Sequence, residues 1–153
     1  MVWFKQIIGH ACGLIALLHA IANGAGKESV TADSPLAKLL TDAQNLKADA
    51  RAQLLYDSAD LETAHMAAAA GGSTAPPDPS EPNGHHFICF VKSAGRLWDL
   101  EGGWSGPVPR CELADDEDVL SEKAIKDGPG RYLDVGRDME ISEFSCVAVC
   151  LED

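Results

Sequence analysis

The sequence lacks several features that would point to common classes of protein. It contains no Cys-x-x-Cys pair, no internal repeat and no long apolar run. Basic residues are scarce, since 12 lysines and arginines stand against 24 aspartates and glutamates, which gives a net charge of -12. Such a balance argues against general affinity for nucleic acid or for an anionic lipid surface. A basic partner fits the charge better.

The cysteines favour neither a disulfide framework nor a zinc site. Their number is odd, and their spacing matches no metal-ligand pattern: Cys12, Cys89, Cys111, Cys146 and Cys150. Cys89, Cys146 and Cys150 stand inside apolar runs, where thiols usually pack as small hydrophobic groups. We expect these three side chains to be buried, and we expect no metal and no cofactor.

The start of the chain has only weak features of a secretory signal. Lys5 is the single positive charge before residue 27, and the longest apolar or small run extends from Ala11 to Leu18. No segment approaches the roughly 18 apolar residues that a membrane-spanning helix needs. We therefore expect an intracellular protein of the cytoplasm, with the nucleus as a further location and a secreted protein as the alternative.

The patterns along the chain predict one domain with helices first and strands later. A length of 153 residues, 46% hydrophobic and 24% charged, suits a single globular core. Helices are predicted at 11–23, 33–43, 47–70 and 115–126, a β-hairpin at 86–92 with 96–101, and a buried last strand at 144–151. This order favours an α+β layered domain over a doubly wound sheet.

Between the helical and the strand-rich parts lies a long predicted loop. Residues 71–84, GGSTAPPDPSEPNG, contain four prolines, so neither a helix nor a strand can persist there. Loops of this length in a compact domain are usually binding or lid elements, or else linkers. Composition alone favours a solvated linker.

Cys12 has the position of a nucleophile. It lies near the start of an apolar helix, where the dipole and free N–H groups stabilise a thiolate. A nucleophile also needs a base, and the base needs a group that fixes its tautomer. His85 and His86 open the hairpin, and only one of them can face the helix because consecutive strand residues point to opposite sides. Asp99 and Glu101 end the second strand, and either could orient the histidine.

Two stretches carry motifs of a known family. They are QIIGHACGLIALLHAIAN at 6–23 and HFICFVKSAGRLWDLEG at 86–102. The first has a Gln six residues before Cys-Gly and an apolar helix ending in His-Ala-x-Ala-Asn, and the second has His-Phe followed by a hairpin. Both strongly resemble the ubiquitin C-terminal hydrolases, the UCH family of papain-like cysteine deubiquitinases. The final FSCVAVCL is similar to the family's last strand, so the resemblance covers essentially the whole chain.

The resemblance implies a role for each residue that matches the motifs. Cys12 would attack the carbonyl of the terminal glycine of ubiquitin, form a thioester and so cleave the bond after that glycine. His86 would act as base and then as acid, and Gln6 would donate its amide to the oxyanion beside the N–H of Cys12. Glu101 would orient His86, at a position where the family usually has Asp. Asp99 is the fallback for that role.

The resemblance also implies a fold and partners. We expect the α+β, papain-like UCH fold, an antiparallel sheet flanked by helices, with residues 1–153 as a catalytic domain and 71–84 as a crossover loop over the active site. Ubiquitin would be the partner, with Nedd8 as a second modifier. Cleavage of ester, thioester, amide or peptide bonds would release small or flexible adducts.

In the family a sizeable segment precedes the nucleophile helix, whereas Cys12 lies near the start of this sequence. We therefore expect a domain without its N-terminal portion. The alternative function is that of a catalytically impaired fragment or pseudoenzyme that binds ubiquitin without turnover.

Overall fold

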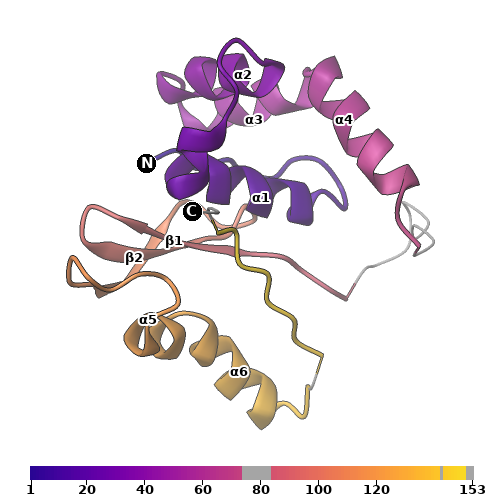
Figure 1. Cartoon of the computed structure of the whole chain (residues 1–153). Helices are drawn as coiled ribbons and strands as arrows, with labels where there is room; N and C mark the ends of the chain where they lie inside the picture. Colours follow the sequence, from indigo (N-terminus) through magenta and orange to yellow (C-terminus); the bar gives the residue numbers. More distant parts are fainter. Residues whose placement is uncertain (74–83, 142, 151–153) are drawn as a thin grey trace.

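Helices cover both faces of a small antiparallel sheet in this computed structural model, which describes residues 1–73, 84–141 and 143–150 (Figure 1). The helices are α1 (Cys12–Asn23), η1 (a 3-10 helix, Ala25–Ser29), α2 (Pro35–Gln44), α3 (Ala48–Tyr56), α4 (Ala59–Ala70), α5 (Glu122–Asp127) and α6 (Pro129–Asp138). The strands are β1 (Cys89–Ser93), β2 (Arg96–Leu100) and β3 (Val108–Glu112), in the order β1-β2-β3. The predicted α+β class is confirmed.

The predicted hairpin forms, but its first strand begins at Cys89 rather than at His86, so His86 and Phe87 precede the strand. Ala94 and Gly95 have φ angles of 49° and 70°, the left-handed values that a tight type I′ connection needs. The register pairs Cys89 with Leu100 and continues to the turn. The third strand, β3, was not predicted, because its proline and charges mask the alternation of a strand, and proline is tolerated on such an edge.

Each face of the sheet packs against different helices. Toward α1 the buried side chains are Trp3, Cys89, Val91 and Leu100, with Ala16 and Ala20 of α1 against them. On the opposite face they are Leu97, Leu113 and Ala124, with Phe90, Cys111 and Val119 against them. Ala124 belongs to α5, so α1 and α5 lie on opposite sides of the sheet. Because of this division, a carboxylate on the face toward α5 cannot reach the nucleophile helix α1.

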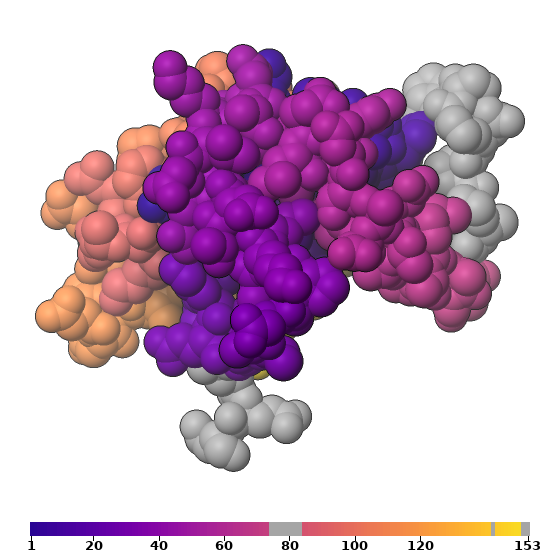
Figure 2. Space-filling model, turned by 90° about the horizontal axis from the view of Figure 1, so that it is seen from above, coloured from indigo at the N-terminus to yellow at the C-terminus, as the bar shows by residue number. Residues whose placement is uncertain are grey.

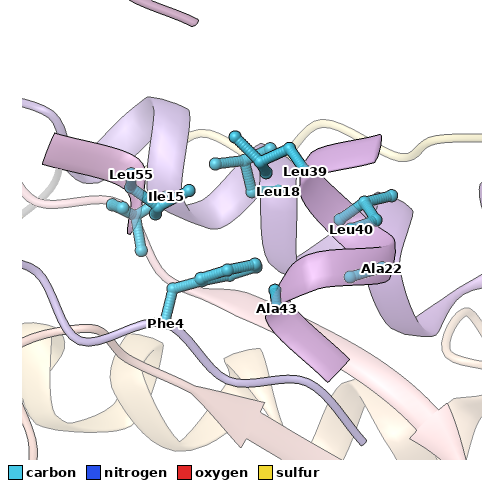
Figure 3. Close-up of a cluster of buried hydrophobic side chains, with 8 residues drawn as sticks. All are labelled: Phe4, Ile15, Leu18, Ala22, Leu39, Leu40, Ala43 and Leu55. Carbon is cyan, nitrogen blue, oxygen red and sulfur yellow. The ribbon is translucent and has the colours of Figure 1, made fainter. Parts of the chain in front are cut away.

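A third cluster joins the N-terminal segment to the helical layer. Its side chains converge from that segment and from α1, α2 and α3 (Figure 3): Phe4, Ile15, Leu18, Ala22, Leu39, Leu40, Ala43 and Leu55. Viewed from above, α2, α3 and α4 cover this side of the molecule (Figure 2). Helix α1 therefore packs on two sides, against the sheet and against the helical layer, in agreement with its apolar sequence.

The single helix predicted at 47–70 is wrong, because the chain forms α3 and α4 with a break between them. Ser58 has extended backbone angles, and its hydroxyl accepts a hydrogen bond from the N–H of Leu61. A serine that caps a new helix competes with continuation of the old one. Leu55 is buried as expected, but Met66 is exposed.

The helix predicted at 115–126 is also shorter than expected. It begins only at Glu122, where the Ser121 hydroxyl caps the first turn. Upstream, Glu117 accepts a hydrogen bond from the N–H of Ala114, and Asp118 accepts one from the N–H of Leu120. Acidic side chains that bond the nearby backbone favour turns over a helix.

The buried last strand is contradicted by the structure. Residues 144–150 are exposed and lie in no helix or strand, and they run from α6 back toward α1 (Figure 1). An apolar pattern reports side chains only, whereas a strand also needs a neighbour for its ladder of hydrogen bonds. Cys146 and Cys150 are therefore exposed, contrary to expectation. Cys89 is buried as expected, and burial raises the pKa of its thiol to about 12.

Most of the predicted loop at 71–84 lies outside the described residues, so the crossover-loop assignment stays a prediction. In the described ranges, no helix is both long and apolar enough to cross a membrane.

Candidate active site

The candidate nucleophile, Cys12, is the first residue of α1. Its side chain is half-buried and its thiol is free. The chain enters the helix through His10 at a left-handed φ of 56° and through Ala11 at the N-cap. Within the described ranges no side chain caps this helix end. The N–H groups of the first turn and the positive end of the helix dipole can therefore stabilise a thiolate.

Phe87 brings the candidate base close to this helix end. Its ring lies over Gly13, where an added Cβ atom would be 3.6 Å from the ring's Cδ2 atom. Gly13 follows Cys12 and Phe87 follows His86. The contact therefore holds the thiol-bearing and imidazole-bearing backbones side by side, although they are far apart in the sequence.

His86 and Glu101 form the candidate proton-transfer pair of the site. Nε2 of His86 lies 2.8 Å from Oε1 of Glu101. With the carboxylate ionised, Nε2 carries a proton and donates it, so Nδ1 is the nitrogen that can take a proton from a thiol. The neighbouring His85 instead lies 3.7 Å from the carboxylate of Glu143. Of the two histidines, the structure thus gives His86 the orienting carboxylate.

The Glu101 side chain is held firmly although it follows the last residue of β2. Its Oε1 also accepts the N–H of Gly103 at 2.6 Å. Its backbone carbonyl accepts the indole N–H of Trp3 at 3.2 Å and the N–H of Trp104 at 3.3 Å. The side chain is 11% exposed, so solvent does little to weaken its bond to His86.

Asp99, the fallback orienter, has other partners. Its Oδ2 accepts hydrogen bonds from the guanidinium of Arg110 and from the hydroxyl of Tyr132, which belongs to α6. Asp99 is completely buried on the sheet face that α6 covers, away from α1. It therefore does not bond His86. The side chain of Glu101 does not follow the alternation of side chains between the two faces of β2, because the strand ends at Leu100.

Gln6, the candidate oxyanion donor, is fixed beside the same turn. Its backbone N–H donates to the carbonyl of Gly102 at 2.8 Å. A Cβ atom on Gly102 would meet the Cβ of Gln6 and a methyl group of Ile15 at 3.0 Å, so a larger residue would push these neighbours aside by a few tenths of an ångström. The side-chain Nε2 donates one hydrogen to the carbonyl of Ile8 at 3.2 Å. Its second hydrogen is the one that an oxyanion could use.

Two further residues position this segment, and the sequence reasoning gave them no role. His19 accepts the N–H of Phe4 at 2.9 Å through Nε2. Asn23, one helical turn later, exchanges two hydrogen bonds of 2.7 Å with the backbone of Val2. The spacing of four residues, which places both side chains on one face of α1, was the available signal. Through the segment they hold, they support Gln6.

The described residues of the candidate site include no cluster of metal-ligating side chains. Across the described residues, His, Cys, Asp and Glu form no group of three or more that could hold a metal ion. What remains is a thiol at a helix N-terminus, an imidazole whose tautomer is fixed by a carboxylate, and a nearby amide donor. A thiol at a helix N-terminus, combined with a histidine that a carboxylate orients, is the arrangement of papain-like cysteine proteases.

Comparison with known proteins agrees with this class and narrows it. The family model "Ubiquitin carboxyl-terminal hydrolase, family 1" matches residues 1–127, and the chain belongs to that family. Ubiquitin carboxyl-terminal hydrolase 3 of Arabidopsis thaliana is 32% identical over 133 residues, covering 84% of this chain and 56% of the relative. The human isozyme L1 is 31% identical over 153 residues, covering 97% of this chain and 63% of the relative.

A solved structure agrees with the fold. The Trichinella spiralis UCH37 catalytic domain, crystallised with ubiquitin vinyl methyl ester, superposes with a TM-score of 0.67 at 21% identity, over 86% of this chain and 56% of that one. The UCH fold predicted from the sequence motifs is thereby confirmed. The chain spans about three-fifths of the length of these relatives.

Proposed function

We propose that this chain is a thiol-dependent ubiquitin C-terminal hydrolase. The observation that carries the proposal is the bond of 2.8 Å between His86 and Glu101, held next to Cys12 by the packing of Phe87 on Gly13. Family membership supports ubiquitin as the partner, and the relative that was crystallised with a ubiquitin probe supports the same chemistry.

The proposed reaction has two stages. His86 Nδ1 takes the proton of Cys12, and the sulfur attacks the carbonyl carbon of the terminal glycine of ubiquitin. Gln6 and the N–H of Cys12 stabilise the oxyanion, and His86 returns the proton to the leaving group. In the second stage His86 takes a proton from water, which attacks the thioester. His86 then returns that proton to the departing sulfur of Cys12. Glu101 stabilises the imidazolium in both stages, and the bond cleaved can be an ester, thioester, amide or peptide bond.

The test is labelling with a ubiquitin probe that carries a C-terminal electrophile. We expect a covalent adduct with the unmodified chain and none with Cys12→Ala. Cys111→Ala is the matched control, because Cys111 is a free, half-buried thiol on the opposite side of the sheet. A folded, unmodified chain that stays unlabelled would refute the proposed activity. The same probe built on Nedd8 tests the second modifier.

A second candidate is a ubiquitin-binding protein without turnover. One contact favours it. Gln6 Nε2 donates a hydrogen bond to the Ile8 carbonyl, so one hydrogen of the proposed oxyanion donor is already engaged. Calorimetric binding of ubiquitin to a chain that the probe fails to label would support this candidate over the enzyme.

A further inference from the structure

A buried ionic cluster lies on the far side of the strand that leads to Glu101. Asp99 is completely buried, and both Nε and Nη2 of Arg110 donate to its Oδ2, at 3.1 and 2.5 Å. The hydroxyl of Tyr132 donates to the same oxygen at 2.8 Å. The guanidinium carbon lies 5.7 Å from the centre of the Trp104 ring and 5.9 Å from that of Tyr132. Arg110 therefore contacts both aromatic rings and the carboxylate together.

This cluster is connected to the proton-transfer pair by a short turn. Trp104 is three residues beyond Glu101, and its N–H donates to the Glu101 carbonyl. Gly103, inside the turn, donates to the Glu101 side chain. The turn that carries the orienting carboxylate is thus fixed at one end by Asp99 in β2 and at the other by the ring of Trp104. Arg110 contacts both of these ends.

We propose that Arg110 is a positioning residue for Glu101, acting through Asp99 and Trp104 to hold the turn from which Glu101 accepts the hydrogen bond of His86. The inference rests on the proposed function for its kinetic consequence only. It does not require Arg110 to touch substrate. The geometric claim, that the cluster sets the tautomer of His86, stands apart from activity.

A lysine could not replace this arginine. The planar guanidinium donates through two nitrogens to one carboxylate oxygen while it presents flat faces to aromatic rings, whereas an ammonium group is a single point charge. Arg110→Lys keeps the charge that neutralises buried Asp99 but loses this geometry. Trp104→Ala breaks the other link of the turn, and since Trp104 is 39% exposed its removal leaves the ion pair in place.

The tautomer of His86 is the decisive readout. In the full chain with 15N-labelled histidine at a pH where the ring is neutral, ring-nitrogen correlation spectra distinguish protonated Nε2 from protonated Nδ1, and His86→Gln assigns the signal. We expect the Nε2-protonated form to dominate in the unmodified chain. In Arg110→Lys and Trp104→Ala we expect the Nδ1-protonated share to rise about fivefold.

Kinetics with a fluorogenic ubiquitin amide supply the second readout. We expect kcat to fall about tenfold in both variants while KM stays within about twofold, because misplacement of a catalytic group acts on the chemical step. The matched control is Arg96→Gln, which breaks the exposed ion pair of 3.1 Å between Arg96 and Glu112 across the same two strands. It should change neither the tautomer nor kcat.

The two claims fail in different ways. A Trp104→Ala chain that is folded by circular dichroism and keeps the tautomer ratio of the unmodified chain would overturn the positioning role, whatever its activity. A tautomer shift in both variants would uphold the positioning role even where the unmodified chain hydrolyses no ubiquitin substrate, and that result would count against the proposed function alone.

Discussion

Asp99 and Glu101 are two residues apart, and both are largely removed from solvent, but their partners differ in kind. Asp99 is bonded to an arginine, which stays charged at any pH that the protein meets. Glu101 is bonded to a histidine, a side chain that can both accept and donate a proton in catalysis. A carboxylate paired with a permanent cation can stabilise a fold, whereas one paired with imidazole can support proton transfer.

Neutral replacements should separate the two roles. We expect Glu101→Gln to lower kcat by roughly 10- to 100-fold, because the imidazolium loses its counter-charge, with a small change in the free energy of unfolding. We expect Asp99→Asn to lower the free energy of unfolding by about 3 kcal/mol, because it leaves Arg110 without a buried partner, and to lower kcat less than Glu101→Gln does, because Asp99 acts on Glu101 only through the turn. Turnover assays and urea denaturation on both variants measure this. Equal losses of turnover in Glu101→Gln and Asp99→Asn would instead indicate that both carboxylates orient His86.

Among the elements, α1 connects the candidate nucleophile with the sheet, the helical layer and the N-terminal segment. Its N-terminus carries Cys12, one face packs on the sheet, and another packs on the helical layer. The polar side chains of His19 and Asn23 hold the N-terminal segment by its backbone. A single helix therefore aligns the nucleophile with the segment that carries the candidate oxyanion donor, Gln6.

His19 makes that alignment dependent on pH. Burial lowers the pKa of His19 to about 4, with partial opposing effects from backbone hydrogen bonding at Leu100 and Phe4 and from the charge of Glu101. Because the unfolded chain binds this proton near pH 6.5 and the folded one does not, the stability that His19 supplies is full above about 6.5 and is lost as the pH falls toward about 4. The total loss from this group is at most about 3 kcal/mol.

Urea denaturation between pH 7 and pH 4.5 tests this dependence. The free energy of unfolding should fall with pH more steeply in the unmodified chain than in His19→Gln, whose amide oxygen can still accept the N–H of Phe4. His65, which lies on exposed α4, provides the control variant His65→Gln. Parallel slopes for the unmodified chain and His19→Gln would rule out His19 as the source.

Elements with local signals were predictable from the sequence, and elements that depend on distant partners were not. The end of α1 at Asn23-Gly24 and the turn at Ala94-Gly95 are determined by neighbouring residues, and the structure has both. The break at Ser58 was hidden because alanines and leucines continue across it. The pairing of β3 with β2 and the exposure of 144–150 depend on contacts that no local pattern contains.

The candidate site divides in the same way. Family motifs pointed to Cys12 and His86 without any geometry. The choice between Asp99 and Glu101 could not be made from alternation, because the strand ends between them. Arg110 was not singled out at all, since an arginine 11 residues beyond Asp99 has no local reason to be its partner.

The molecule as a whole is acidic, and an apolar region is exposed in the part of it that the structure describes. The charge of -12 is spread over the chain and suits a basic partner. The apolar region lies in the last described part of the chain, where the large exposed side chains are Val135, Met139, Ile141, Phe144, Val147 and Val149. Residues 144–150 also leave backbone groups outside any ladder. Exposed apolar side chains beside unpaired backbone favour association.

We therefore expect the isolated chain to associate through residues 144–150 as its concentration rises. Val147 is 88% exposed, so Val147→Lys combined with Val149→Lys should suppress association without disturbing the core. Tyr56→Lys, at a side chain of α3 that is 63% exposed, introduces the same charge elsewhere and should leave association unchanged. Light scattering coupled to gel filtration over about a hundredfold range of concentration measures the mass. A mass that stays monomeric across that range, or equal suppression by Tyr56→Lys, would show that this segment does not drive association.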